Sequence, residues 1–222
     1  NSDYFDAIYG KGIQLTTLSK HLEAIAYFDK ALSIYPKNAQ SILNKGISFY
    51  QVGNYTESQL NLDLVLQENP NHILALYHKS LVLFALHKYE DALGYCDRVL
   101  QIDPNYSDAL YHKAKTLFEI GLTNDAVSYF DKALSINPTN VSTLYNKGVA
   151  LAWLGKHDEA IVLYDKALSI NPQFTNALCD KGISLQALGD YNASLVTYEN
   201  AIKLDPQFID AIYNEGLLLS SV

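Results

Sequence analysis

The 222-residue sequence contains no methionine, only one tryptophan and only two cysteines. Cys96 and Cys179 are far apart and lack the paired spacing of a disulfide framework or a zinc site. We therefore expect reduced thiols, no metal or other cofactor, and a reducing compartment, which we take to be the cytoplasm. The missing methionine also predicts that this is a trimmed piece of a longer chain.

Long apolar runs and excess positive charge are absent too. The run Leu81–Leu86 is too short to span a bilayer, and no signal-peptide pattern opens the chain, so we expect a soluble protein without a membrane partner. The formal net charge is −8 and the sequence pI is about 5.1, with no basic stripe that would neutralise phosphates. Nucleic acid is therefore excluded as an expected partner.

The sequence also lacks the common catalytic motifs. It contains no G-x-x-x-x-G-K, no H-E-x-x-H and no G-x-S-x-G. The best metal-ligand candidates are His78, Asp108 and His112, but histidines that face a groove are the favoured interpretation. We predict that the chain is not an enzyme.

What the sequence does contain is a regular repeat. Its six prolines fall every 34 residues, at Pro36, Pro70, Pro104, Pro138, Pro172 and Pro206. They predict a single array over residues 1–222, with complete repeats at 5–38, 39–72, 73–106, 107–140, 141–174 and 175–208, and a partial repeat at 209–222. Residues 1–4 are interpreted as the tail of a preceding repeat.

Each repeat carries two apolar patterns of helical period with a break between them. In residues 141–174 the break contains Gly155, at a point where a chain leaving a helix often needs positive φ. The second helix must end before Pro172, because the residue before a proline avoids the α region. Gly148 lies inside the first helix, where it predicts close approach of the second helix.

These residues resemble the tetratricopeptide repeat over nearly the whole chain. Its signature is matched in residues 141–174 by Leu144, Gly148, Leu151, Ala160, Tyr164 and Pro172, with Lys147 where the family has leucine. The resemblance implies an all-α, right-handed superhelical solenoid of antiparallel helix pairs. It also implies an inner groove, lined by the first helices, that binds peptide segments of partner proteins.

Two further sets of residues recur with the repeat. Each complete repeat has a lysine in its first helix and an acid in its second helix. These charges predict a ladder of ion pairs between adjacent helices, and independent solvated charges are an equally weighted alternative. The residues are Lys11, Lys45, Lys79, Lys113, Lys147, Lys181, Asp29, Asp63, Asp97, Asp131, Asp165 and Glu199. In the partial repeat the lysine position is Glu215, which we expect to have no second helix to pair with.

The inner face of the first helices is where the repeats differ. We trace it through Leu43, Cys179, Ile183 and Tyr213 among others, and predict partner contacts at Tyr77, Leu81, Phe84, Tyr111, Lys115, Phe118, Tyr145, Val149 and Trp153. Each tyrosine is equally consistent with packing between neighbouring first helices. Asn44, Asn146 and Asn214 could belong to a carboxylate clamp, but Ile47, Val149 and Ile183 stand where a clamp needs polar groups.

The sequence therefore predicts a protein–protein interaction scaffold that binds a partner peptide or helix in an apolar and aromatic groove. A basic residue of the partner could meet acids such as Asp180 or Asp210. The alternative is the regulatory or substrate-recruiting arm of a larger enzyme whose catalytic domain lies outside this sequence. Self-association through the unfinished last repeat is a third possibility.

Overall fold

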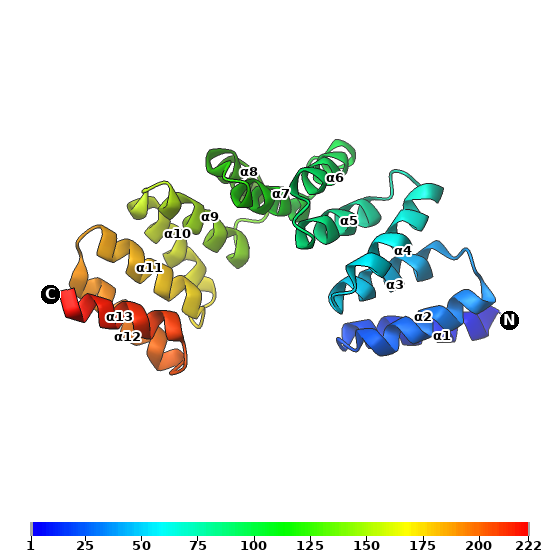
Figure 1. Ribbon diagram of the computed structural model, residues 1–222, viewed down its shortest axis with the longest axis horizontal. Coiled ribbons are helices and arrows are strands. Elements are labelled where there is room, and N and C mark those ends of the chain that lie inside the picture. Colours follow the sequence, from blue (N-terminus) through cyan, green and yellow to red (C-terminus); the bar gives the residue numbers. More distant parts are fainter. Residues whose placement is uncertain (1, 222) are drawn as a thin grey trace. The chain divides into compact units, whose positions relative to one another are not determined.

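The computed structural model describes residues 2–221, and these residues form thirteen α-helices. The first helices of the repeats are α1 (Ser2–Thr17), α3 (Ala39–Gln51), α5 (Ile73–Ala85), α7 (Ser107–Glu119), α9 (Val141–Trp153), α11 (Thr175–Ala187) and α13 (Ile209–Ser221). The second helices are α2 (His21–Ile34), α4 (Tyr55–Glu68), α6 (Tyr89–Ile102), α8 (Thr123–Ile136), α10 (His157–Ile170) and α12 (Tyr191–Leu204). The predicted pair of helices in each repeat is confirmed (Figure 1).

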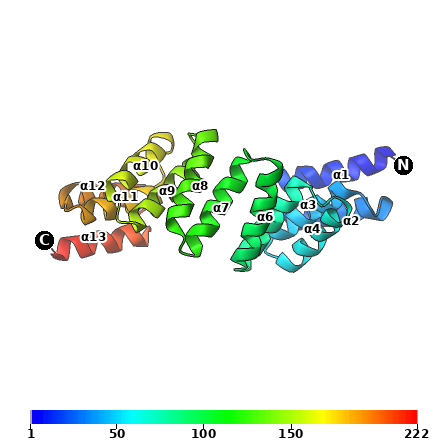
Figure 2. The same ribbon diagram turned by 90° about the horizontal axis from the view of Figure 1, so that it is seen from above.

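The chain divides into two compact units at Ala109 and Leu110, here called the N-terminal unit and the C-terminal unit. The boundary falls inside α7, close to its beginning. Within the C-terminal unit, α10 packs against both α9 and α11, and α12 packs against both α11 and α13, so each second helix lies between two first helices (Figure 2). A single continuous array over the whole chain stays a prediction.

The breaks between helices follow the predicted turn chemistry. Gly53, Gly121, Gly155 and Gly189 all adopt positive φ, near 80°, between the first and second helix of their repeats. Ser19 and His87 occupy the same position in their repeats and also adopt positive φ, at 57°. The turn therefore requires a left-handed backbone conformation at this position, even in repeats where a side chain makes that conformation less favourable.

The two helices of a repeat approach each other closely at the small residue of the first helix. A Cβ atom at Gly148 would lie 2.6 Å from Cε1 of Tyr164, and one at Gly182 would lie 2.4 Å from Cε1 of Tyr198. Both tyrosine rings are fully buried, because the missing side chain makes room for them. The close approach predicted for Gly148 is confirmed.

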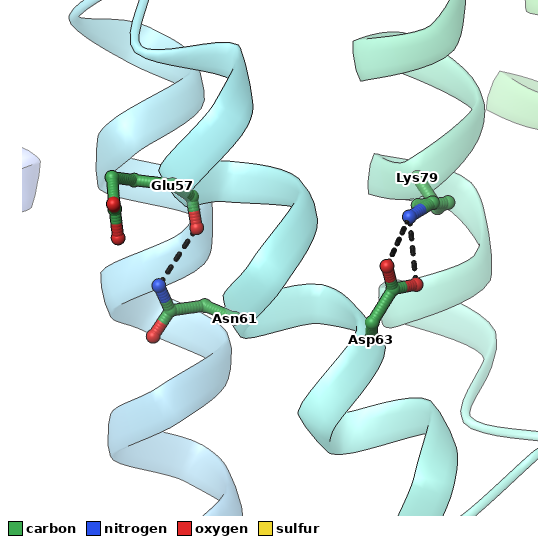
Figure 3. Close-up of polar contacts among 4 residues, drawn as sticks. All are labelled: Glu57, Asn61, Asp63 and Lys79. Atoms are coloured by element: carbon green, nitrogen blue, oxygen red, sulfur yellow. Dashed lines mark hydrogen bonds and ion pairs between the residues drawn. The ribbon is translucent and has the colours of Figure 1, made fainter.

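The predicted lysine ladder is confirmed at four pairs. Each pair joins the second helix of one repeat to the first helix of the next, with nitrogen to oxygen distances of 2.5 to 2.6 Å at Asp29 and Lys45, Asp63 and Lys79, Asp131 and Lys147, and Asp165 and Lys181. At Lys79 the ammonium group contacts both carboxylate oxygens of Asp63 (Figure 3). The ladder therefore contributes to the contact between repeats.

The direction of this pairing corrects one expectation. Because each lysine pairs with the acid of the preceding repeat, the counterpart of Glu215 is Glu199 on α12, against which α13 packs. Glu215 does have a second helix beside it, and the junction of α12 and α13 carries two acids at the positions of an ion pair.

The N-terminus differs slightly from its expected boundary. Residues 2–4 belong to α1 and continue its helix, whereas the equivalent residues of later repeats lie in the turn before the first helix. Their assignment to a preceding repeat stays a prediction. Asn1 lies outside the described residues. Across residues 2–221, none of the helices combines the length and the apolar character that crossing a membrane requires.

Candidate functional site

Trp153 is the most exposed large apolar side chain of the described residues, at 77%. It is the last residue of α9, and the next residue, Leu154, ends the helix. Its ring meets the ring of Phe118 on α7 edge to face, with centroids 6.3 Å apart and planes at 83°. The structure thus brings these two predicted site residues together on neighbouring first helices of the C-terminal unit.

A hollow of about 230 Å³ lies beside Trp153, between α9, α10 and α11. We call it the Trp153 hollow; it is lined by Val149, Ala152, Trp153, His157, Tyr164, Asp180, Ile183 and Ser184. Its wall is mainly apolar, and Asp180 is its only residue with a carboxylate. Val149 and Trp153 were predicted from the sequence as partner contacts, and both lie in this wall.

Two more hollows border the same first helices. One, of about 320 Å³, lies between α9, α11 and α13 and includes Asp180, Asp210 and Tyr213. The other, of about 510 Å³, lies between α11, α12 and α13 and includes Gln186 and Asn214. Ile183, which is 42% exposed, lines all three hollows. The inner face of the C-terminal unit is therefore a row of connected depressions centred on α11.

Negative charge gathers on this face. The hydroxyl of Tyr145 on α9 donates a 2.7 Å hydrogen bond to Oδ2 of Asp180 on α11. Burial raises the pKa of the Asp180 carboxyl, the hydrogen bond from Tyr145 lowers it, and the nearby negative charge of Asp210 raises it again. No lysine or arginine lines any of the three hollows.

Hydrogen bonds between consecutive first helices involve the groove tyrosines. The amide nitrogen of Asn44 donates to the hydroxyl of Tyr9 at 3.0 Å, and that of Asn146 donates to Tyr111 at 3.1 Å. The hydroxyl of Tyr145 instead donates to Asp180, which occupies the position of these asparagines in its own repeat. These tyrosines therefore pack and bond between repeats, and the asparagine amides are engaged within the protein instead of being presented as a clamp.

Two positions of the predicted groove trace are buried. Leu43 is 2% exposed and Cys179 is 3% exposed, so neither offers appreciable surface to a partner, although Cys179 lies in the wall of the hollow between α9, α11 and α13. Burial also raises the pKa of the Cys179 thiol to about 11, which makes it a poor nucleophile. The expectation that Cys179 could be accessible is wrong, because its side chain packs with Tyr198 and Leu218. Cys96 is fully buried, as predicted for a packing residue.

The predicted site residues of the N-terminal unit lie on α5. Tyr77 packs against Tyr106 with centroids 5.5 Å apart, and Phe84 packs against Tyr89 at the same distance. Tyr77, Leu81 and Phe84 are all half-buried. Lys115 on α7 of the C-terminal unit is likewise half-buried. These residues have part of their surface open, but less than Trp153.

Sequence reasoning missed two polar residues of the Trp153 hollow, Ser184 and His157. Ser184 is equivalent to Ser48, Val82, Thr116 and Ala150 in other repeats, so a hydroxyl at this position is common in the chain and gave no signal. His157 begins α10 where Tyr55, Tyr89 and Tyr191 begin their helices. No signal in the helical pattern placed it beside the groove either.

Four models of the tetratricopeptide repeat match the sequence, and together they span well over half of it. They match residues 6–38, 83–127, 141–174 and 184–221, and all are described as tetratricopeptide or TPR repeats. The chain belongs to the tetratricopeptide repeat family. No curated protein matches its sequence.

Solved tetratricopeptide repeat structures share the fold at low sequence identity. PilF of Pseudomonas aeruginosa is 16% identical with a TM-score of 0.83, over 97% of this chain and 98% of that one. The chain matched in the complex Cut9-Hcn1 of the APC/C is 16% identical with a TM-score of 0.84, but the match covers 96% of this chain and 42% of that one. YrrB, described as a TPR protein with an unusual peptide-binding site, is 19% identical with a TM-score of 0.69, over 85% and 97% of the two chains.

Tetratricopeptide repeats mediate protein–protein interactions, and this chain carries the paired helices of that family. Within residues 2–221, no group of three or more His, Cys, Asp or Glu side chains is arranged to hold a metal ion. The three hollows of the C-terminal unit offer apolar contact, hydrogen bonding and negative charge.

Proposed function

We propose that this protein is a non-enzymatic scaffold that binds a segment of a partner protein along the inner face of its first helices. The observation that carries the proposal is the exposure of Trp153 beside a hollow with a mainly apolar wall. A large apolar side chain left 77% exposed costs solvation in the free protein, and burying it against a partner recovers that cost.

The chemistry of the surface supports a peptide or helix as the occupant. Aromatic residues are preferred anchors at interfaces, because they bury a large area at a low cost in conformational entropy. Trp153 and Phe118 provide two such rings in contact with each other, and Val149 and Ile183 provide apolar surface nearby. The predicted contacts Tyr111, Lys115 and Tyr145 lie on the same first helices, and Tyr77, Leu81 and Phe84 supply half-buried surface on α5 of the N-terminal unit.

A comparative pull-down from a lysate of the source cells tests the proposal. Wild-type protein, a Trp153→Ala, Phe118→Ala double variant and a Val162→Ala control would each be immobilised, and the retained proteins quantified. Val162 is a suitable control because it is 53% exposed on α10 and does not line the three hollows. We expect the double variant to lose partners that the wild type and the control both retain.

The opposite result is equally clear. If the double variant retains the same partners with unchanged affinity, Trp153 and Phe118 are not part of the binding surface. Circular dichroism of all three proteins would show whether the comparison is between folded molecules. Both aromatic side chains are at least partly exposed, so their removal should leave the helices intact.

A further inference from the structure

The Trp153 hollow contains polar atoms that lack partners within the protein. Ser184 is 1% exposed and lines the hollow, and its Oγ atom has no hydrogen-bond partner among the described residues. The buried Nδ1 atom of His157 also has no partner there. Both atoms have almost no accessible surface, and the equivalent atoms of Ser48 and His21 in other repeats lack partners as well, so these atoms follow from the repeat and do not distinguish the hollow.

Asp180 adds a charge without a counter-ion to the same hollow. Its Oδ2 atom accepts the hydrogen bond from Tyr145, and no cation forms an ion pair with it among residues 2–221. Three lysines on or beside α9, α10 and α11 are engaged elsewhere. Lys147 pairs with Asp131, Lys181 pairs with Asp165, and Lys156 pairs with Glu159.

The remaining wall is apolar and aromatic. Val149, Ala152 and Ile183 offer aliphatic surface, and the exposed indole of Trp153 closes one side. Tryptophan is the aromatic side chain that attracts cations most strongly over its ring face. The hollow therefore combines a carboxylate, an aliphatic wall and an indole within about 230 Å³.

We propose that the Trp153 hollow binds an arginine side chain of the partner segment. The guanidinium group pairs with Asp180 and stacks on Trp153, while its aliphatic stem lies along Val149 and Ile183. Arginine fits better than lysine because its planar group carries five donors and stacks on aromatic rings, whereas the lysine ammonium is a strongly hydrated point charge. The net charge of −8 favours the approach of such a basic segment.

The proposal rests on the proposed function, since it names one chemical feature of the partner segment. It also agrees with the state of Asp180 in the free protein. Burial and the charge of Asp210 raise the pKa of this carboxyl, and an arriving cation would lower it by stabilising the ionised form. Asp210 lines the adjoining hollow and adds a second negative charge near the same guanidinium.

The test uses N-acetylarginine amide as the probe and the full chain labelled with ¹⁵N as the receptor. The protein contains one tryptophan, so the indole N–H of Trp153 gives a single, assignable NMR signal. We expect arginine amide to shift this signal saturably in the millimolar range. N-acetylcitrulline amide has the same shape without the charge, and we expect it to bind about tenfold more weakly or not at all.

Variants test the named contacts. Asp180→Asn should weaken arginine amide binding by about tenfold, and Val149→Ala by a smaller factor, because the first removes the charged partner of the guanidinium and the second removes apolar surface along the stem. Glu159→Gln is the matched control: it removes one negative charge from α10, but Glu159 is exposed, pairs with Lys156 and does not line the hollow. It should leave the affinity unchanged. The ¹⁵N spectrum of each variant reports its folding, and Val149→Ala keeps the test available if Asp180→Asn fails to fold.

Equal shifts by arginine and citrulline amides, or unchanged binding by both Asp180→Asn and Val149→Ala, would overturn the proposal. This result is separable from failure of the scaffold function. Arginine amide could fail to bind while protein partners still depend on Trp153 and Phe118 in the pull-down. Conversely, arginine amide could bind as expected while the pull-down shows no such dependence, which would reject the scaffold function alone.

Discussion

The hydroxyl of Tyr145 donates a 2.7 Å hydrogen bond to Oδ2 of Asp180, 35 residues further along the chain. The contact joins α9 to α11, two first helices of consecutive repeats. It orients a half-buried carboxylate at the edge of the Trp153 hollow while leaving the second oxygen of that carboxylate available. A tyrosine of the repeat pattern thus acts in packing and also positions a charge of the candidate site.

Removing this hydroxyl should raise the pKa of Asp180. The hydrogen bond from Tyr145 stabilises the ionised carboxylate, so Tyr145→Phe leaves burial and Asp210 to raise the pKa further. An acid whose pKa is raised by folding stabilises the folded state less as pH rises through that pKa. We therefore expect Tyr145→Phe to lose about 1 kcal/mol of unfolding free energy at pH 7 and less at pH 3. Carboxyl ¹³C titration and urea unfolding at both pH values measure this; an unchanged Asp180 pKa would contradict it.

Gly148 and Gly216 occupy the same repeat position but should respond oppositely to alanine. A Cβ at Gly148 would lie 2.6 Å from the buried ring of Tyr164, so Gly148→Ala should cost about 1–3 kcal/mol through overpacking. Gly216 has no heavy atom within 4 Å of that point, so Gly216→Ala should gain up to about 1 kcal/mol from helix propensity. Urea unfolding of both variants measures the two changes in unfolding free energy. A shift of the same sign in both would show that the contact with Tyr164 is not what requires glycine.

The ion pair between Asp63 and Lys79 should couple more strongly than an exposed pair within one helix. The side chain of Lys79 is only 6% exposed, whereas Lys20 and Glu23 are 56% and 58% exposed. A double-mutant cycle with Asp63→Asn and Lys79→Met should give a coupling energy of about 1 kcal/mol, and the cycle at Lys20 and Glu23 about 0.3 kcal/mol. Both cycles would be measured by urea unfolding at low and high salt. Equal coupling in the two pairs would mean that the ladder contributes no more than solvated charges.

His78 should make the protein less stable in mild acid. Burial lowers the pKa of its imidazole to about 4, from an ordinary value of 6.5. Between these values the unfolded chain binds a proton that the folded chain does not, so the unfolding free energy falls as pH decreases from 6.5 to 4. His78→Gln should flatten this part of the pH dependence, while His87→Asn, at an exposed position with positive φ, should not. Urea unfolding across this range tests the prediction, and an unchanged slope in His78→Gln would refute it.

Much of the architecture follows from local residue patterns. The proline period, the glycine of the turn and the small residue facing Tyr164 each impose a local geometry that does not depend on distant residues. Helix positions, the positive φ at Gly155 and the close approach at Gly148 were all predictable for this reason. The ladder was predictable as a set of residues but not in its pairing, because only packing decides which acid lies beside each lysine.

The candidate site was only partly predictable. Trp153 was identified because no other repeat carries a tryptophan, and Phe118 because a phenylalanine is less expected at its position in the repeat. Leu43 and Cys179 were placed on the groove by helical spacing alone, yet neighbouring repeats bury them. Self-association through α13 stays a prediction, supported by the exposure of Ile212 and Leu219 at 43% and 61%.

The sequence by itself determined that this chain is a series of paired helices, since a 34-residue period with fixed turn residues specifies each repeat locally. It could not determine which polar residues would lie beside Trp153. Ser184, His157 and Asp180 lie on two helices and become neighbours of Trp153 only when α9, α10 and α11 pack together. Tertiary structure decided the chemistry of the site, because burial and hydrogen-bond satisfaction are properties of the packed repeats and not of any one of them.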